Sequence, residues 1–383
     1  MRSRLNTLAF CCLFPAILAG GGAAVGTTTT TTTTMVNAST GADVSAAEWK
    51  ALVTAAKPGT TIYLGTRHVI FTRIRGVHDI TIKGGEFGPI TLDQWQNVTF
   101  DSTRFNARTS ERTTGPYIDA YTPQGLTFRN TTFIGWVNST TGALAGYSLN
   151  IRGGSNVSVL GSTFRDMANF MTFIRTTNVN VLDNDFTNIR EGVRLVGTTN
   201  GFILRNRIGP FKPATGDHAD CVQFFTAGLT LATDHAAYNS TVTDNLMLSS
   251  GAGRSQGIFV RDEANLWQSG RGYNGLTIIN NLLIGTGWHG IALGAGATNV
   301  TITNNRLWLR VGGDTVTDNW VKLDSDTATS LTTNQAGSFL LTGKYQTSGN
   351  IINKTPPSLT QINSLVNAWQ TTFRPGKSYP PVT

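Results

Sequence analysis

An eight-residue pattern that recurs nine times constrains the fold of this chain more than any other feature of its sequence. Its clearest copies are VNVLDNDF at residues 179–186, LTIINNLL at 276–283 and VTITNNRL at 300–307. The third and eighth residues are apolar in every copy, and five copies carry asparagine at the sixth position. Each copy predicts a short strand that ends in a turn. The copies start at Ile80, Val98, Leu126, Val157, Val179, Gly201, Ser240, Leu276 and Val300.

Such a repeat predicts coils that stack on one another, because one short coil cannot bury its own apolar face. The third and eighth residues are expected to line a common core, and the longer spacings are expected to hold loops. The sixth-position asparagines are expected to hydrogen-bond from coil to coil, which explains them without any function. They are Asn184, Asn206, Asn245, Asn281 and Asn305.

A second strand with alternating apolar residues is expected in most coils. The five segments that predict it start at Asn169, Glu191, Asp220, Gln256 and His289. Upstream of the repeats, residues 45–65 predict an amphipathic helix followed by a turn and a strand. That helix is expected to cap the first coil and to cover its open edge.

On these features the chain from about Ser45 onward resembles the right-handed parallel β-helix family of carbohydrate-active proteins. The resemblance implies an all-β fold, a single-stranded right-handed parallel β-helix (solenoid) with an N-terminal capping helix and a C-terminal tail, over residues 45–383. The family includes pectate and alginate lyases, mannuronan C5-epimerases, polygalacturonases and phage tailspikes. The fold alone does not choose among these activities.

The N-terminal residues are typical of an exported protein. Arg2 and Arg4 precede an apolar run over residues 5–18, and small residues follow it. We predict a signal peptide at residues 1–24 and a threonine-rich, low-complexity spacer at residues 25–44. A secreted or periplasmic protein is therefore expected, and no other segment is long and apolar enough to span a membrane.

Composition narrows the classes of partner. Charged residues make up 14% of the chain and its formal net charge is +8. No run rich in lysine and arginine with interleaved aromatic residues is present, so a nucleic-acid partner is not predicted. A diffuse basic surface suits an acidic polysaccharide. After removal of the signal peptide only Cys221 would remain, so no internal disulfide is expected.

The stretch ATGDHADCVQFFTAG, residues 214–228, concentrates polar groups at the start of a predicted strand. Alignment of the second strands places Glu191 and Asp220 on neighbouring coils, about 4.8 Å apart. Two carboxylates at that distance raise each other's pKa unless a cation lies nearby, and Arg194 is a candidate for that cation. The polar candidates within the stretch are Asp217, His218, Asp220 and Gln223.

Three long predicted loops flank this face, at residues 210–216, 227–238 and 262–275. Long loops on adjacent coils are expected to form the walls of a groove. The aromatic residues that are candidates to stack on sugar rings are Trp267, Tyr273 and Trp288. The charged residues that are candidates to contact substrate are Arg261, Asp262, Glu263 and His289.

For a uronate polymer, lyase and C5-epimerase chemistry begin in the same way. The substrate carboxylate is neutralised, for which Arg194, Arg261 and Gln223 are candidates, and a base then removes the C5 proton. His218 is the candidate base, because its side chain titrates near neutral pH and Asp217 and Asp220 flank it. The candidates to supply a proton are Tyr273 and His289.

Other interpretations stay open. A hydrolase would pair two carboxylates, for instance Asp220 with Glu191 or with Asp262. A tailspike-like or surface module would bind glycans without catalysis, and Asp217 would then only cap a turn. No cofactor is required for any of these activities. Calcium is a further candidate ligand, held by carboxylates drawn from Glu191, Asp217, Asp220, Asp262 and Glu263.

Overall fold

The computed structural model describes residues 43–70, 73–112, 115–169, 171–214, 217–249, 255–287, 289–309, 319–324, 329–342 and 345–382, without the side chains of residues 147 and 148. The predicted signal peptide, and the predicted spacer up to residue 42, lie outside the described residues. The end of that spacer belongs to the fold, because Val44 forms a parallel bridge with Val69 and is fully buried. Among the described residues, no helix has both the length and the apolar character needed to cross a bilayer.

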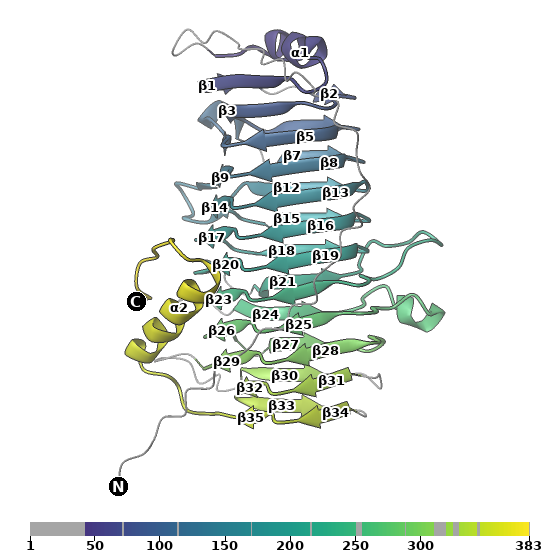
Figure 1. The fold of residues 1–383 in the computed structure, drawn as a ribbon, viewed down its shortest axis with the longest axis vertical. Coiled ribbons are helices and arrows are strands. Elements are labelled where there is room, and N and C mark those ends of the chain that lie inside the picture. Colours follow the sequence, from purple (N-terminus) through teal and green to yellow (C-terminus); the bar gives the residue numbers. More distant parts are fainter. Residues whose placement is uncertain are drawn as a thin grey trace, which may run out of the picture. The chain divides into compact units, whose positions relative to one another are not determined.

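The chain winds into stacked coils, most of which contain three strands (Figure 1). One coil in the middle of the stack runs through β16 (Thr177–Leu182), β17 (Asp185–Thr187) and β18 (Val193–Val196). Equivalent strands of successive coils pair in parallel, so that β16 lies between β13 and β19. The strands equivalent to β16 and β17 belong to one 22-stranded sheet, and those equivalent to β18 form an 11-stranded sheet. The predicted all-β parallel β-helix is confirmed.

The remaining strands fall into three series. The strands equivalent to β16 are β3 (Thr81–Phe87), β5 (Gln96–Asp101), β8 (Gln124–Arg129), β13 (Ser155–Leu160), β19 (Thr199–Leu204), β22 (Thr241–Thr243), β25 (Thr277–Ile279), β28 (Val300–Thr303), β31 (Thr329–Thr332) and β34 (Tyr345–Ser348), preceded by β1 (Thr61–Val69). Those equivalent to β17 are β6 (Arg104–Asn106), β9 (Thr132–Ile134), β14 (Thr163–Arg165), β20 (Arg207–Ile208), β23 (Leu246–Leu248), β26 (Leu282–Ile284), β29 (Arg306–Trp308), β32 (Gln335–Ala336) and β35 (Ile351–Ile352). Those equivalent to β18 are β2 (Arg73–Arg75), β4 (Ile90–Asp93), β7 (Pro116–Tyr121), β12 (Tyr147–Arg152), β15 (Met171–Ile174), β21 (Ala219–Phe225), β24 (Ser255–Val260), β27 (His289–Leu293), β30 (Trp320–Leu323) and β33 (Ser338–Leu341). Outside these series lie the short pair β10 (Trp136–Val137) and β11 (Leu144–Ala145), and the 3₁₀ turns η1 (Thr109–Glu111) and η2 (Leu266–Ser269).

A left-handed residue at the fifth position of the repeat turns each coil. In all nine copies this residue has a φ between +52° and +70°, as at Asp183 (φ 59°) and Asn280 (φ 57°). Asparagine, aspartate and glycine tolerate this region better than other residues, and they fill it in seven of the copies. The turn bends the chain between the strands equivalent to β16 and those equivalent to β17. Eight copies therefore form two strands around a corner, while in the first copy both sides of the turn belong to β3.

The apolar columns of the repeat form the core, as predicted. The third and eighth residues of all nine copies are buried. Eighth-position phenylalanines stack nearly face to face along the coils, with ring centroids 4.8 Å apart for Phe105 and Phe133, 4.5 Å for Phe133 and Phe164, and 4.7 Å for Phe164 and Phe186. Each ring therefore completes the packing of the coils above and below it.

The sixth-position asparagines point into the core and form a continuous ladder, which confirms their predicted role. The Nδ2 group of Asn206 donates to Asn245 Oδ1 at 3.0 Å and to the carbonyl of Val181 at 2.8 Å. Its Oδ1 accepts from the backbone N–H and the side-chain Nδ2 of Asn184. The ladder continues beyond the predicted copies to Asn334. Every rung thus satisfies buried polar groups that would otherwise destabilise the core.

Helix α1 (Ala46–Ala55) caps the first coil, as predicted. The hydroxyl of Ser45 accepts from the backbone N–H of Glu48, which stabilises the start of the helix. Trp49 and Val53 are buried, and the Trp49 ring meets the edge of Phe87 at a centroid distance of 5.6 Å. The helix therefore continues the aromatic core and covers the open end of the stack.

The predicted C-terminal tail contains a second helix, α2 (Leu359–Phe373), which the repeat pattern did not predict. Figure 1 shows it lying along the outside of the coils beside β23 and β26. Its buried face covers outward-pointing leucines and isoleucine of those strands. Residues of the helix and of the strands in this cluster are Ile362, Val366, Trp369, Leu246, Leu248, Leu282 and Ile284.

Candidate functional site

The candidate residues gather on the outer face of the 11-stranded sheet, where β18, β21, β24 and β27 pair. Arg194 pairs in register with Gln223, which pairs in turn with Phe259. Four polar residues stand at the entrance of these strands on successive coils, and we call them the polar row. The polar row consists of Glu191, Asp220, Gln256 and His289, which are the first residues of four of the five predicted second strands.

Two carboxyl groups of the polar row lie next to each other. The backbone N–H of Asp220 donates to Glu191 Oε2 at 3.3 Å. Burial raises the pKa of Glu191 to about 7, although this hydrogen bond and Arg194 act in the opposite direction. Asp220 is only 2% exposed, and burial, followed by the charge of Glu191, raises its pKa well above the ordinary range. Burial therefore favours the neutral form of Asp220, while Glu191 is partly ionised near neutral pH.

Arg194 lies beside this pair. Its Nε donates to Gln223 Oε1 at 2.6 Å, and its guanidinium group lies 4.9 Å from the centre of the Phe225 ring. Burial lowers the pKa of Arg194, and the charge of Glu191 is the largest influence that opposes this. Arginine remains charged under such conditions, so the face carries a fixed cation next to a carboxyl group that titrates near neutral pH.

His218 is exposed where the chain enters β21. Its Nδ1 lies 3.4 Å from the Nε2 of Gln256, one coil away. Asp217 was also predicted to be catalytic, and its contacts contradict that prediction. Arg190 binds both carboxylate oxygens of Asp217, at 2.5 and 2.7 Å, and the backbone N–H of Ala214 donates to it at 2.6 Å. Asp217 therefore caps the turn that holds His218, which was the alternative interpretation.

His289 ends the polar row, and its protonation state follows from its neighbour. The indole Nε1 of Trp320 lies 2.7 Å from His289 Nδ1. An indole can only donate, so the Nδ1 accepts and the neutral ring carries its proton on Nε2. Burial, and then the charge of Lys322, lower the pKa of His289. His289 thus presents a neutral N–H donor and does not suit the predicted role of proton source.

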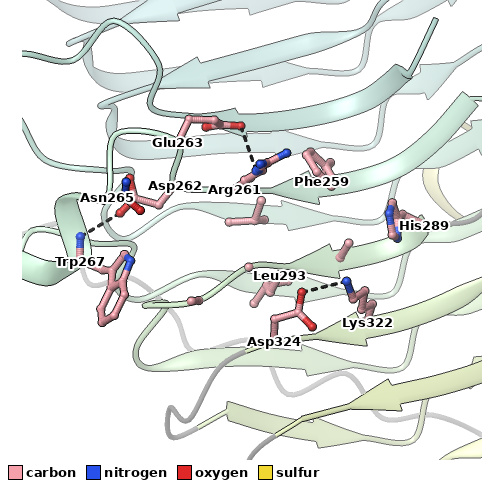
Figure 2. Close-up of a pocket in the computed structure, with 14 residues that line it drawn as sticks. Phe259, Arg261, Asp262, Glu263, Asn265, Trp267, His289, Leu293, Lys322 and Asp324 are labelled. Atoms are coloured by element: carbon pink, nitrogen blue, oxygen red, sulfur yellow. Dashed lines mark hydrogen bonds and ion pairs between the residues drawn. The ribbon is translucent and has the colours of Figure 1, made fainter. Parts of the chain in front are cut away.

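A pocket of about 570 Å³ opens beside the polar row, over β24, β27 and β30 (Figure 2). Its walls carry apolar, aromatic and charged side chains, and Arg261 is 66% exposed there. In the view of Figure 2, Trp267 and His289 stand on opposite sides of it. The labelled lining residues are Phe259, Arg261, Asp262, Glu263, Asn265, Trp267, His289, Leu293, Lys322 and Asp324.

The loop that follows β24 is hydrogen-bonded to the preceding coil. The hydroxyl of Thr226 donates to Asp262 Oδ1 at 2.8 Å, and its backbone N–H donates to Glu263 Oε2 at 3.3 Å. Asp262 also accepts from the backbone N–H of Trp267 at 2.8 Å. Asp262 and Glu263 therefore line the pocket, while their oxygens hold the wall that presents Trp267. Their role in substrate contact stays a prediction.

Tyr273 does not reach the pocket, and its predicted role as a proton donor is wrong. The residue is 1% exposed, and its hydroxyl donates to the carbonyl of Arg261 at 2.9 Å. Its ring packs edge-on against Phe224 inside the core. Trp288, the third predicted aromatic residue, lies outside the described residues.

A second pocket of about 300 Å³ lies on the other side of Phe225, over β12, β15 and β18. Its floor is apolar, and three arginines surround it. Arg152 bonds to Asp119 and Arg175 to Asp234, so both are held in place. The lining side chains are Arg152, Thr172, Ile174, Arg175, Arg194, Val196, Phe225, Ala227 and Leu229. We call the two pockets and the surface between them the groove.

Sequence reasoning missed part of this groove. Lys322 and Trp320 lie on β30, in the coil that starts with the Val300 copy, but no second strand was predicted for that coil. Arg152 ends β12 and Arg175 follows β15, three and two strands from β21. The period-two alternation of β12 and β30 was the signal that could have found Arg152, Trp320 and Lys322. Within the described residues, no group of three or more histidine, cysteine, aspartate or glutamate side chains is arranged to hold a metal ion. The calcium site stays a prediction.

Comparisons with known proteins agree with the fold. A family model described as a right-handed β-helix region matches residues 81–319, while no curated protein sequence matches the chain. The surface adhesin PfbA of Streptococcus pneumoniae is 14% identical, with 77% of this chain and 78% of the adhesin covered and a TM-score of 0.50. The periplasmic alginate epimerase AlgG is 13% identical (82% and 80% covered, TM-score 0.44), and an alginate lyase from Paenibacillus sp. is 11% identical (82% and 95% covered, TM-score 0.38). At such identities the likeness concerns the fold alone. The family match spans more than half of the chain, and the chain belongs to the right-handed β-helix family.

Proposed function

We propose that the groove binds a uronate-containing polysaccharide and removes the proton from C5 of one sugar unit, as a lyase or a C5-epimerase. The observation that carries this proposal is the position of Glu191, a carboxyl group with a pKa of about 7, beside the guanidinium group of Arg194. A base that titrates near neutral pH and a fixed cation are the two groups that this reaction needs.

The cation is needed because the reaction moves charge onto the substrate. When a base takes the C5 proton, the electron pair of the C–H bond shifts toward the adjacent carboxylate. Arg194 and the exposed Arg261 are placed to stabilise that charge. In a lyase the bond from C4 to its oxygen then breaks, and the base returns its proton to the leaving oxygen. In an epimerase C5 instead takes a proton from solvent on the opposite face.

Two groups are candidates for the base. His218 is exposed at the entrance of β21, as the sequence predicted, and Glu191 is partly buried on the neighbouring coil. Asp220 is not a third candidate, because its side chain is almost completely covered. The proton on Nε2 of His289 makes that residue a hydrogen-bond donor to a bound sugar.

The groove has features that suit a long acidic chain. The two pockets lie on either side of Phe225, along the direction in which the coils stack. Each pocket combines an apolar floor with cationic side chains, and Trp267, 42% exposed, offers a ring on which a sugar can stack. We also propose that the protein is secreted or periplasmic, on the basis of the predicted signal peptide.

The test is to incubate the protein with a panel of uronate polysaccharides in D₂O. A lyase produces ultraviolet absorbance from the unsaturated sugar, and an epimerase incorporates deuterium at C5 without absorbance. Glu191→Gln should lower either signal by about 10²-fold or more. Turnover of neutral polymers alone, or a fully active Glu191→Gln variant, would refute the proposal.

A hydrolase is the second candidate, favoured by the adjacent carboxyl groups of Glu191 and Asp220. The 2% exposure of Asp220 argues against it, because a general acid must reach the glycosidic oxygen. New reducing ends without absorbance would identify hydrolysis. Binding of uronate polymers without any turnover would instead identify a glycan-binding module.

A further inference from the structure

A line of three side chains runs inward from the entrance of the groove. It consists of His218, Gln256 and Asp220. Asp220 and Gln256 are register partners on β21 and β24, so their backbones lie about 4.8 Å apart. Gln256 Nε2 lies 3.4 Å from His218 Nδ1. Asp220 and Gln256 are 2% and 5% exposed, whereas His218 is exposed. This line of side chains, which differs from the polar row, therefore leads from the buried carboxyl group of Asp220 to the imidazole of His218 at the surface.

Both buried members keep an oxygen that needs a proton. Within the described part of the chain, Asp220 Oδ1 and Gln256 Oε1 have no hydrogen-bond partner. A buried acceptor without a donor costs about 1–3 kcal/mol, and two neighbouring acceptors repel each other. A neutral carboxyl group has one proton to donate, and burial favours this neutral form of Asp220 because it raises the pKa of the carboxyl group. One O–H group donated by Asp220 to Gln256 satisfies both oxygens.

That hydrogen bond determines which way the Gln256 amide points. When Oε1 accepts from Asp220, the amide NH₂ is left to face His218, and it donates to the ring Nδ1. A ring nitrogen that accepts carries no proton, so the neutral imidazole must hold its proton on Nε2.

We propose that Gln256, held by the protonated carboxyl group of Asp220, fixes neutral His218 as the tautomer with its proton on Nε2. His218 then serves the groove as a hydrogen-bond donor, and Glu191 remains as the base that takes the C5 proton. Gln256 is a positioning residue, since it acts through His218. The assignment of the base rests on the proposed function, whereas the tautomer of His218 does not.

Nitrogen NMR of the whole chain, labelled with ¹⁵N-histidine and free of substrate, tests the tautomer directly. Long-range ¹H–¹⁵N correlations distinguish a protonated from an unprotonated ring nitrogen at about pH 8, where an ordinary imidazole is neutral. The chain contains a reference for each tautomer. His289 accepts on Nδ1 from Trp320, and His235 donates from Nδ1 to the carbonyl of Ala236 at 2.5 Å. The His218 signal is the one missing from His218→Ala.

Variants test whether the hydrogen bonds along this line of side chains, and not packing alone, determine the tautomer of His218. Gln256→Met keeps the size of the side chain and removes both amide contacts, so the His218 signal should move toward a mixture of tautomers. Asp220→Asn still donates to Gln256 Oε1 and should keep the wild-type tautomer, whereas Asp220→Leu should lose it. Gln346→Met is the control, because Gln346 is exposed on β34, several coils away from Asp220 and Gln256, and the tautomer should not change.

The outcomes are distinct. A wild-type His218 with its proton on Nε2, lost in Gln256→Met and retained in Asp220→Asn, supports the proposal. A proton on Nδ1 in the wild-type protein, or the same tautomer in Gln256→Met, overturns it. The wild-type spectrum alone decides if Gln256→Met does not fold. None of these results depends on turnover, so they leave the test of the proposed function independent.

Discussion

Replacement of Glu191 by glutamine should change how the stability of the protein depends on pH. The folded protein raises the pKa of Glu191 from its ordinary 4.5 to about 7, mainly through burial. Each pH unit of such a difference is worth about 1.4 kcal/mol, so the rise corresponds to about 3 kcal/mol. Because the folded state favours the neutral acid, this stability is present below pH 4.5 and is lost as pH rises through 7.

Glutamine stays neutral at every pH, so the Glu191→Gln variant should not show that loss. Urea unfolding, followed by tryptophan fluorescence between about pH 4 and pH 8, gives the free energy of unfolding of both proteins. Relative to wild type, the variant should gain about 3 kcal/mol across this range, since the other carboxyl groups titrate in both proteins. A difference between Glu191→Gln and wild type that does not vary with pH would show that Glu191 is ionised as freely as an exposed residue.

Other changes have outcomes that the geometry fixes. Arg194→Ala should weaken binding of a uronate oligosaccharide about tenfold or more in calorimetry at low salt, because a charge-assisted hydrogen bond is lost; unchanged affinity would remove Arg194 from the site. Asn206→Ala should lower the free energy of unfolding by about 3 kcal/mol, since it leaves buried groups of the asparagine ladder without partners, while Asn180→Ala, on the outer face, should cost less than about 1 kcal/mol. Trp369→Ala should release helix α2 and make the C-terminal segment sensitive to limited proteolysis, whereas Leu359→Ala, at the exposed start of that helix, should not.

The repeat predicted the core well because its signal is local and periodic. Each apolar column and each asparagine rung repeats in the sequence, so stacking follows from one coil meeting the next. The fifth-position turn was in the same pattern, and its aspartate, asparagine and glycine residues were the signal for it. Helix α2 lies outside the repeat, and its signal was a capping box formed by Ser358 and Gln361.

The candidate site was harder to predict, because loops decide which polar groups meet. The register of Glu191, Asp220 and Arg194 followed from aligning the inward residues of the second strands, and the structure places them together. Asp217 was misassigned since its partner, Arg190, lies 27 residues earlier in the chain. Tyr273 was misassigned because an aromatic residue in a long polar loop is expected to be exposed. The side chain of Tyr273 instead points inward, and its hydroxyl donates to the carbonyl of Arg261. Such contacts depend on the path that each loop takes back to the sheet, which short sequence patterns do not predict.

The docking of helix α2 has a consequence for the order in which the protein is made. Arg374 and Tyr379 bond to Asp185, so a segment synthesised nearly two hundred residues later completes the surface of a middle coil. During translation the coils can stack as they emerge, but the apolar stripe that includes Leu246 and Leu282 stays uncovered until α2 has left the ribosome. A nascent chain, or one truncated before α2, would display that stripe to chaperones and to other nascent chains. The synthesis of helix α2 therefore ends the period in which the apolar stripe of the earlier coils is exposed to aggregation.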